Sequence, residues 1–245
     1  MDTIILGDGP LGHAIETALR ERGDRPRLFG RPVGGRHDPA TLADADVVVE
    51  ASRSAAVAGN IEAALAAGCR RFVVATTGWQ ADTARVAAEL ESNGAAAVVA
   101  PNLAIGSAVF LRLVDEAARL FATLTDFDPY VLEWHRRTKA DQPSGTAREI
   151  VRRIAGWRAE GEPEIAVIRA GAAPGMHLVG FDAPAETIEL RLTARDRSGY
   201  AAGALAAADW LIAEPRSRGV HPFDLVVDDL LAAPAARGSV VTAAA

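Results

Sequence analysis

The stretch from Glu133 to Thr146 gathers the side chains best suited to chemistry. It follows an apolar run at 130–132 that is typical of a strand, and it leads into a helical pattern that begins near Thr146. Its cationic side chains are His135, Arg136, Arg137 and Lys139. Cations beside the free N–H groups of a helix N-terminus, here at 144–146, favour a small carboxylate or phosphate. The sequence therefore predicts an anion-binding loop between two rigid elements.

His135 and Lys139 are the two side chains in this loop that could hand over a proton, since arginines stay charged at all relevant pH. A helical turn between them would bring both onto one face, because their spacing is i, i+4. Histidine supplies a proton near neutral pH, and a lysine can do so where crowded cations lower its pKa. The same composition also fits a solvated basic loop followed by a helix cap.

A glycine turn near the N-terminus is the second candidate site. Residues 3–6 predict a buried strand, and residues 13–22 show a helical pattern that ends at Gly23. The turn between them consists of Gly7, Asp8, Gly9, Pro10, Leu11 and Gly12. Strand, G-x-G-x-x-G turn and helix in this order favour dinucleotide binding, because the glycines let the backbone approach a pyrophosphate. The alternative is a plain tight turn.

The second strand, expected at 27–29, bears on which dinucleotide is bound. It runs into Gly30 and Arg31, and no carboxylate follows until Asp38. The absence of a carboxylate here removes the repulsion that a 2′-phosphate would meet, and an arginine can bind that phosphate. NADPH is therefore favoured, with NADH as the alternative. Arg31 could equally be a solvated loop residue.

Strand and helix patterns alternate through the first half of the chain. Strands are expected at 47–49, 71–75 and 96–99, with helices at 55–67 and 81–90 between them. This alternation predicts an α/β fold of the Rossmann type, with a doubly wound parallel sheet. Ligand contacts in such sheets come from the loops after the strand C-termini. These loops are Glu50–Arg53, Ala75–Trp79 and Ala100–Leu103.

The second half predicts a different domain. Helical patterns at 107–121 and 147–157 precede strand-like runs at 165–169, 177–181 and 187–194. Together they predict an α+β substrate domain built on an open mixed sheet. Further helices are expected at 200–212 and 223–231, and the tail from Ala232 is expected to be disordered. Arg169 and His177 are expected to be structural.

Composition narrows the class of protein. The 245 residues are 49% hydrophobic, which is enough for a real core, and the formal charge of −6 gives no support for nucleic-acid binding. No apolar run approaches ~18 residues, and Asp2 and Gly7 interrupt the first one, which argues against a membrane span or signal peptide. One cysteine, Cys69, fits a cytosolic setting. The five histidines look scattered, so no metal is expected.

The central stretch resembles the signature of the 4-hydroxy-tetrahydrodipicolinate reductase family, usually Glu-x-His-His-x-x-Lys-x-Asp-x-Pro-Ser-Gly-Thr-Ala. His135, Lys139, Asp141 and Pro143–Ala147 match it. The family's Asp-Phe-Thr/Ser, Gly-Thr-Thr-Gly-Phe and Ala-x-Asn-Phe-Ser-x-Gly stretches are similar, in the same order, to 50–52, 75–79 and 100–106. The resemblance implies cofactor contacts from Ser52, Ala75, Thr76, Thr77, Ala100, Pro101, Asn102 and Leu103.

The resemblance also implies a reaction. A nicotinamide cofactor would give hydride to a cyclic imino dicarboxylate, and His135 and Lys139 would supply the proton. Substrate contacts are implied for Arg136, Ser144, Gly145, Thr146 and Arg197, although Arg195 competes with Arg197 for the last assignment. The implied domains are 1–104 for the dinucleotide, 105–197 for substrate binding and oligomerisation, and 198–245 returning to the first. A homotetramer is implied.

Several departures from the family pattern lie near the substrate. The second histidine of the signature is Arg136 here, and Trp134 fills a position usually occupied by something smaller. The family's glycine turn is one residue longer, and its segment of Arg-x-Gly-x-Arg type before the strand at 165–169 is missing. Two alternatives therefore stay open: a diverged member that reduces another cyclic imine or enamine acid, and a non-catalytic dinucleotide-binding sensor.

Overall fold

A parallel six-stranded sheet forms the first half of the fold in the computed structural model, which describes residues 1–32, 34–158 and 161–232. Its strand order is β10-β5-β4-β3-β1-β2. The strands are β1 (Asp2–Leu6), β2 (Arg25–Phe29), β3 (Val47–Glu50), β4 (Arg71–Val74), β5 (Ala96–Val99) and β10 (Gly219–Pro222).

Helices cover both faces of this sheet. Successive residues of a strand point to opposite faces, so β1 contributes side chains to the core on each side. Ile4 and Leu6 of β1 belong to the core formed with α2 (Val57–Ala66) and α3 (Thr83–Ser92). Ile5, between them, belongs to the core formed with α1 (Pro10–Glu21) and α6 (Ser198–Ala213). The predicted doubly wound arrangement is confirmed.

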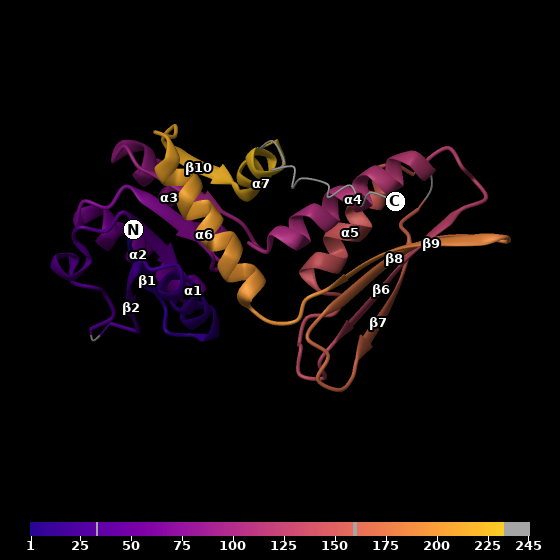
Figure 1. Ribbon diagram of the computed structural model, residues 1–245, viewed down its shortest axis with the longest axis horizontal. Coiled ribbons are helices and arrows are strands. Elements are labelled where there is room, and N and C mark those ends of the chain that lie inside the picture. The colour runs from indigo at the N-terminus through magenta and orange to yellow at the C-terminus, as the bar shows by residue number, and fades with distance from the viewer. Residues whose placement is uncertain (33, 159–160, 233–245) are drawn as a thin grey trace, which may run out of the picture.

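A four-stranded mixed sheet, ordered β7-β6-β8-β9, forms the second half of the fold. Its strands are β6 (Asp128–His135), β7 (Glu164–Arg169), β8 (Met176–Ala183) and β9 (Glu186–Thr193), and β6 pairs in parallel with β7. The long helices α4 (Ile105–Phe121) and α5 (Gly145–Ala155) pack on one face through Phe110, Ile150 and Val179. On the other face Trp134 and Ile168 are each 39% exposed. Figure 1 shows the two sheets side by side, with α4 leading from one to the other.

The chain returns to the first sheet after β9. Helix α6 packs against α1, and β10 adds a strand beside β5, where the Gly219 N–H donates to the Ala95 carbonyl at 2.9 Å. The last described helix is α7 (Phe223–Ala232). The predicted tail beyond Ala232 lies outside the described residues. Among the described helices, none has the length and apolar character needed to cross a membrane.

The structure differs from the predicted elements in three places. Strand β10 was not predicted. Helix α1 begins at Pro10, inside the glycine turn, because proline is well suited to a first helical position. Strand β6 runs on to His135, so the predicted loop begins later than expected. Short 3₁₀ helices lie at Pro39–Leu42, Ser54–Ala56 and Gln80–Asp82.

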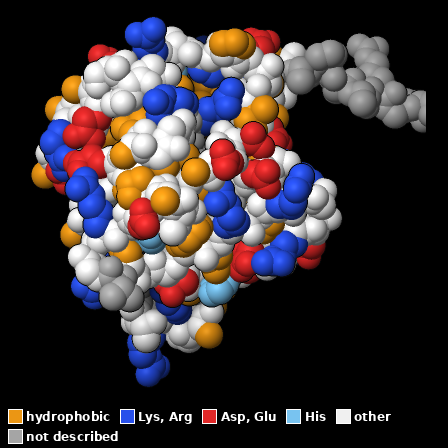
Figure 2. Space-filling model, turned by 90° about the vertical axis from the view of Figure 1, so that its left-hand side faces the viewer, with side chains coloured by type: hydrophobic (Ala, Val, Ile, Leu, Met, Phe, Trp, Pro, Cys, Tyr) orange, Lys and Arg blue, Asp and Glu red, His pale blue; other side chains and the backbone are white. Residues whose placement is uncertain are grey.

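Acidic and basic side chains are interspersed over the face beside the six-stranded sheet (Figure 2).

Candidate functional site

The glycine turn is packed tightly on its inner side and open on its outer side. A Cβ on Gly12 would lie 1.9 Å from the Gly7 carbonyl oxygen, and one on Gly7 would lie 2.3 Å from the Ala51 oxygen. A Cβ on Gly9 would meet nothing within 4 Å. Helix α1 begins directly after Gly9, so its N-terminus faces this opening. The turn therefore fits a dinucleotide pyrophosphate, which needs close backbone approach and a helix N-terminus.

A buried carboxyl group links two of the loops at the ends of the strands. Glu50, fully buried at the end of β3, accepts hydrogen bonds from the Ser52 N–H at 2.8 Å, the Asn60 amide at 2.7 Å and the Thr76 hydroxyl at 3.2 Å. The Ser52 hydroxyl also donates to it. Burial raises the pKa of Glu50, although these donors oppose the rise. Glu50 thus fixes Ser52 and Thr76, two of the predicted cofactor contacts, in one network.

The other predicted cofactor residues lie along the same edge. Arg31, Thr77 and Pro101 are exposed, Ala75 is half-buried, and Ala100 and Leu103 are buried. Asn102 accepts a hydrogen bond from the Ala104 N–H at 2.9 Å and donates to the Ser107 hydroxyl at 3.1 Å. Its amide group therefore holds the start of α4, where the chain passes from the first sheet to the second.

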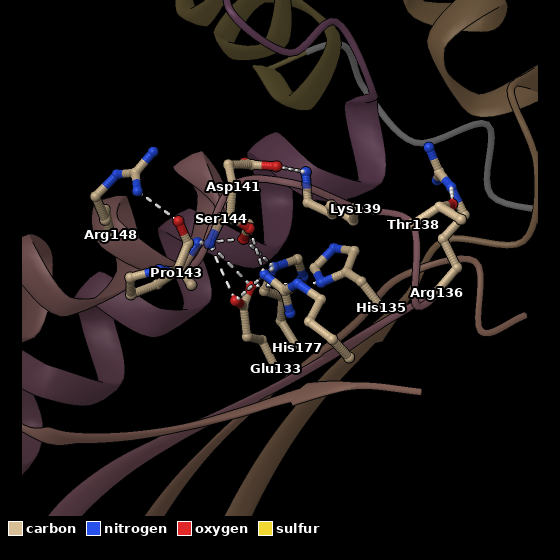
Figure 3. Close-up of polar contacts among 12 residues, drawn as sticks. Glu133, His135, Arg136, Thr138, Lys139, Asp141, Pro143, Ser144, Arg148 and His177 are labelled. Carbon is tan, nitrogen blue, oxygen red and sulfur yellow. Dashed lines mark hydrogen bonds and ion pairs between the residues drawn. The ribbon is translucent and has the colours of Figure 1, made fainter. Parts of the chain in front are cut away.

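A second buried carboxylate, Glu133, organises the central stretch. It lies in β6 on the same face as His135, because the two are separated by one residue, and directly opposite His177 of β8. Arg169 of β7 pairs in register with His135. Four groups therefore converge on the Glu133 side chain from three strands and the start of α5. Figure 3 shows His135, His177 and Ser144 around it.

Distances define how these groups meet. The Arg169 guanidinium donates to Glu133 Oε1 at 2.6 Å, and the Ser144 N–H donates to the same oxygen at 3.0 Å. His135 Nδ1 lies 3.4 Å and His177 Nε2 lies 3.7 Å from Oε2. His177 Nε2 also lies 3.1 Å from the Ser144 hydroxyl. The buried charge of Glu133 is thus compensated on both oxygens.

This arrangement shifts the pKa of each titratable member. Burial alone would raise the pKa of Glu133, but hydrogen bonds from Ser144 and Arg169 outweigh it and hold that pKa below its usual value. Burial lowers the pKa of His135, although Glu133 opposes the change. Burial and the neighbouring His135 lower the pKa of His177 to about 4. Glu133 therefore carries a negative charge near neutral pH and faces the positive Arg169 guanidinium.

Lys139 is held differently from the prediction. The backbone turns after β6, with the Lys139 N–H donating to the Arg136 carbonyl at 3.1 Å, so no helical turn joins His135 to Lys139. The Lys139 ammonium lies 2.6 Å from Asp141, and this contact lowers the pKa of Asp141. In Figure 3 Lys139 and Asp141 lie beside each other, above Glu133 and His177. The idea of a shared helical face is therefore wrong, because the β6 strand continues through His135.

The predicted substrate residues are dispersed. Arg136 is exposed, its Nε lies 3.2 Å from the Thr138 hydroxyl, and Figure 3 shows it apart from the Glu133 group. Ser144 is buried and caps α5 by accepting from the Ala147 N–H, while Gly145 and Thr146 begin that helix. Because the backbone N–H of Ser144 donates to Glu133, this N–H is not free to bind an anion. Arg197 is exposed at the start of α6, beside α1.

Sequence reasoning missed the roles of Glu133, Arg169 and His177 in this group. Glu133, His135 and His177 bring one possible ligand atom each to within 4.8 Å of one another, so the expectation of scattered histidines is wrong. A cation there would share the Glu133 carboxylate with the Arg169 guanidinium. The alternation of Val131, Glu133 and His135 is the signal that could have placed Glu133 on the same face as His135, if the predicted strand had been extended to His135.

Comparisons with known proteins identify the family of this chain. The family model described as "Dihydrodipicolinate reductase, N-terminus" matches residues 29–103. The model described as "Dihydrodipicolinate reductase, C-terminus" matches residues 106–226. The glycine turn and α1 lie before the first match. A 4-hydroxy-tetrahydrodipicolinate reductase of Methanoregula boonei is 36% identical over 181 residues, which is 68% of this chain and 69% of the relative. That of Archaeoglobus fulgidus is 34% identical over 205 residues, 76% of this chain and 77% of the relative.

A solved structure supports the fold. A dipicolinate-bound dihydrodipicolinate reductase from Paenisporosarcina sp. TG-14 superposes with a TM-score of 0.69 at 18% identity, covering 91% of this chain and 97% of that one. The matched ranges include β3, β4, β5 and β10 of the first sheet, the whole second sheet and the Glu133 group. On the strength of the family matches and the relatives, this chain belongs to the dihydrodipicolinate reductase family.

Proposed function

We propose that this protein reduces 4-hydroxy-tetrahydrodipicolinate to tetrahydrodipicolinate with NAD(P)H, in lysine and diaminopimelate biosynthesis. Relatives at 33–36% identity carry that reductase name. The observation that carries the proposal is the 3.4 Å distance between His135 Nδ1 and the buried Glu133 carboxylate, because a carboxylate this close favours the protonated ring that can donate a proton.

The cofactor would lie along the strand ends of the first sheet. Gly7–Gly12 would hold the pyrophosphate, and Ser52, Thr76 and Asn102 would face the nicotinamide half. The bound cofactor supplies hydride. Arg31, exposed directly after Gly30, would pair with a 2′-phosphate, which favours NADPH over NADH.

The proton would come from the second sheet. His135 directs Nδ1 toward Glu133, which leaves Nε2 for the substrate. A bound dicarboxylate would bring negative charge close to His135 and Lys139, and such charge favours their protonated forms. Gly145, Thr146 and Arg136 would bind the carboxylates, with Arg197 approaching as the domains close and exclude water.

The domain roles follow the proposed boundaries. Residues 1–104 would bind the dinucleotide, 105–197 would bind substrate and form the oligomer, and 198–245 would return to the first domain. The exposed face of the second sheet, with Trp134 and Ile168, would meet other copies of the chain in a homotetramer. The setting would be the cytosol.

A second candidate is the reduction of another cyclic imine or enamine acid. Arg136 favours it, because this substitute for the family's second histidine lies apart from the Glu133 group in Figure 3. The substrate pocket then need not match that of the relatives.

An assay of NADPH oxidation with enzymatically generated 4-hydroxy-tetrahydrodipicolinate tests the proposal. Robust turnover is expected. Tight NADPH binding with turnover of a different cyclic imino acid would instead support the second candidate. Absence of turnover with every cyclic imino acid would contradict both.

A further inference from the structure

The carboxyl group of Asp8 lies over Gly30 at the end of β2. Strands β1 and β2 are parallel neighbours with Leu6 beside Phe29, and the Gly7 N–H donates to the Phe29 carbonyl at 2.8 Å. A Cβ built on Gly30 would lie 2.7 Å from Asp8 Oδ2 and 3.1 Å from Asp8 Cγ. The Asp8 side chain therefore fills the space where a side chain at position 30 would begin.

This position matters because dinucleotide-binding folds hold the adenosine ribose near the end of β2, usually with a carboxylate that follows the first glycine turn by about 20 residues. Here β2 reads Arg-Pro-Arg-Leu-Phe and continues into Gly30 and Arg31, without a carboxylate of its own. Asp8 brings one to the same corner from the glycine turn. Its side chain is exposed, so the carboxylate is open to a ligand beside the turn.

Asp8 and Arg31 would have opposite effects on the choice of cofactor. A carboxylate accepts hydrogen bonds from the 2′- and 3′-hydroxyls of a ribose and repels a 2′-phosphate, whereas a guanidinium attracts that phosphate. Arg31 follows Gly30 directly and is exposed. The end of β2 thus carries two groups with opposite preferences: Asp8 is suited to NADH, and Arg31 is suited to NADPH.

We propose that Asp8 accepts hydrogen bonds from the adenosine ribose hydroxyls of NADH and so determines the discrimination between NADH and NADPH. The inference rests on the proposed function, because it requires a dinucleotide in the Gly7–Gly12 turn. Asp8 makes NADH an accepted cofactor and limits the advantage that Arg31 gives to the 2′-phosphate.

Calorimetric titration of the full-length protein with NAD⁺ and NADP⁺ tests this role without turnover. Asp8→Asn is expected to weaken NAD⁺ binding about tenfold and to strengthen NADP⁺ binding about threefold, since it removes a charged acceptor and a repulsive charge. Arg31→Ala should weaken NADP⁺ binding and leave NAD⁺ binding nearly unchanged. Asp126→Asn, at an exposed aspartate before β6, removes the same charge elsewhere and should change neither constant.

The outcomes separate this inference from the proposed function. If the wild type binds either nucleotide but Asp8→Asn leaves the ratio of the two dissociation constants within about twofold of wild type, the role of Asp8 is wrong and the proposed function stands. If the wild type binds neither nucleotide, the proposed function fails and this inference fails with it. A thermal unfolding curve of Asp8→Asn that matches wild type shows that any change in the ratio arises at the binding site.

Discussion

Oε2 of Glu133 lies 3.4 Å from Nδ1 of His135, inside a sheet where both side chains are buried. Burial and the cations Lys139 and Arg169 lower the pKa of His135. Glu133 is the stronger of the two carboxylates that oppose this change, and Asp141 is the other. The Glu133 carboxylate is fixed by Arg169 and by the Ser144 N–H. The proposed proton donation by His135 would thus depend on Glu133.

Glu133→Gln should lower kcat by at least about tenfold, because the neutral amide no longer stabilises the imidazolium. If protonated His135 is required, kcat/KM falls as pH rises through its pKa, and the substitution should move that fall to lower pH. Rates across a pH series measure both effects. Glu149→Gln, which removes the partner of Arg153 on α5, is the matched control. An unchanged rate and pH profile would rule out this dependence.

His177 should make the protein less stable in mild acid. Its pKa is lowered from 6.5 to about 4, so the unfolded chain binds a proton before the folded one does. This difference contributes on the order of 3 kcal/mol to the free energy of unfolding. The contribution is fully present above about pH 6.5 and is lost as the pH falls to about 4. His177→Gln should flatten the free energy of unfolding over that range in urea titrations. The same slope in both proteins would show that another group is responsible.

The Glu50 network should matter for both stability and cofactor affinity. Glu50→Gln places an amide donor among the donors of Ser52, Asn60 and Thr76, which should cost about 1–3 kcal/mol of unfolding free energy. NADP⁺ affinity should fall as well, because the two predicted contacts lose their anchor. Glu62→Gln, on the surface of α2, should affect neither quantity strongly. Unaltered NADP⁺ affinity in Glu50→Gln would separate Ser52 and Thr76 from the cofactor.

The open face of the second sheet should carry the oligomer contact. Trp134→Lys is expected to yield smaller species in sedimentation velocity, because a charge is costly in an apolar interface. Trp157→Lys, at the end of α5 and similarly exposed at 41%, should leave the mass unchanged. A wild-type protein that sediments as a monomer would exclude the tetramer.

Local sequence patterns predicted most of the first sheet and its helices, because buried strands such as Val47–Glu50 are nearly continuous apolar runs. Strand β10 was not predicted because Gly219–Pro222 is short and contains glycine, histidine and proline. It forms a strand only because it pairs with β5 in the folded protein. The catalytic candidates could be chosen by residue type and family resemblance. Their partners could not, because Arg169 and His177 reach Glu133 only through the register of β7 and β8.

The most direct test of the central claim is NADPH oxidation with 4-hydroxy-tetrahydrodipicolinate, measured for wild type and Lys139→Ala side by side. If His135 and Lys139 supply the proton, wild type turns over and Lys139→Ala loses about 100-fold or more in kcat while NADP⁺ affinity is retained. His135→Ala should behave in the same way. Wild-type turnover in both folded variants would contradict proton donation by these two residues.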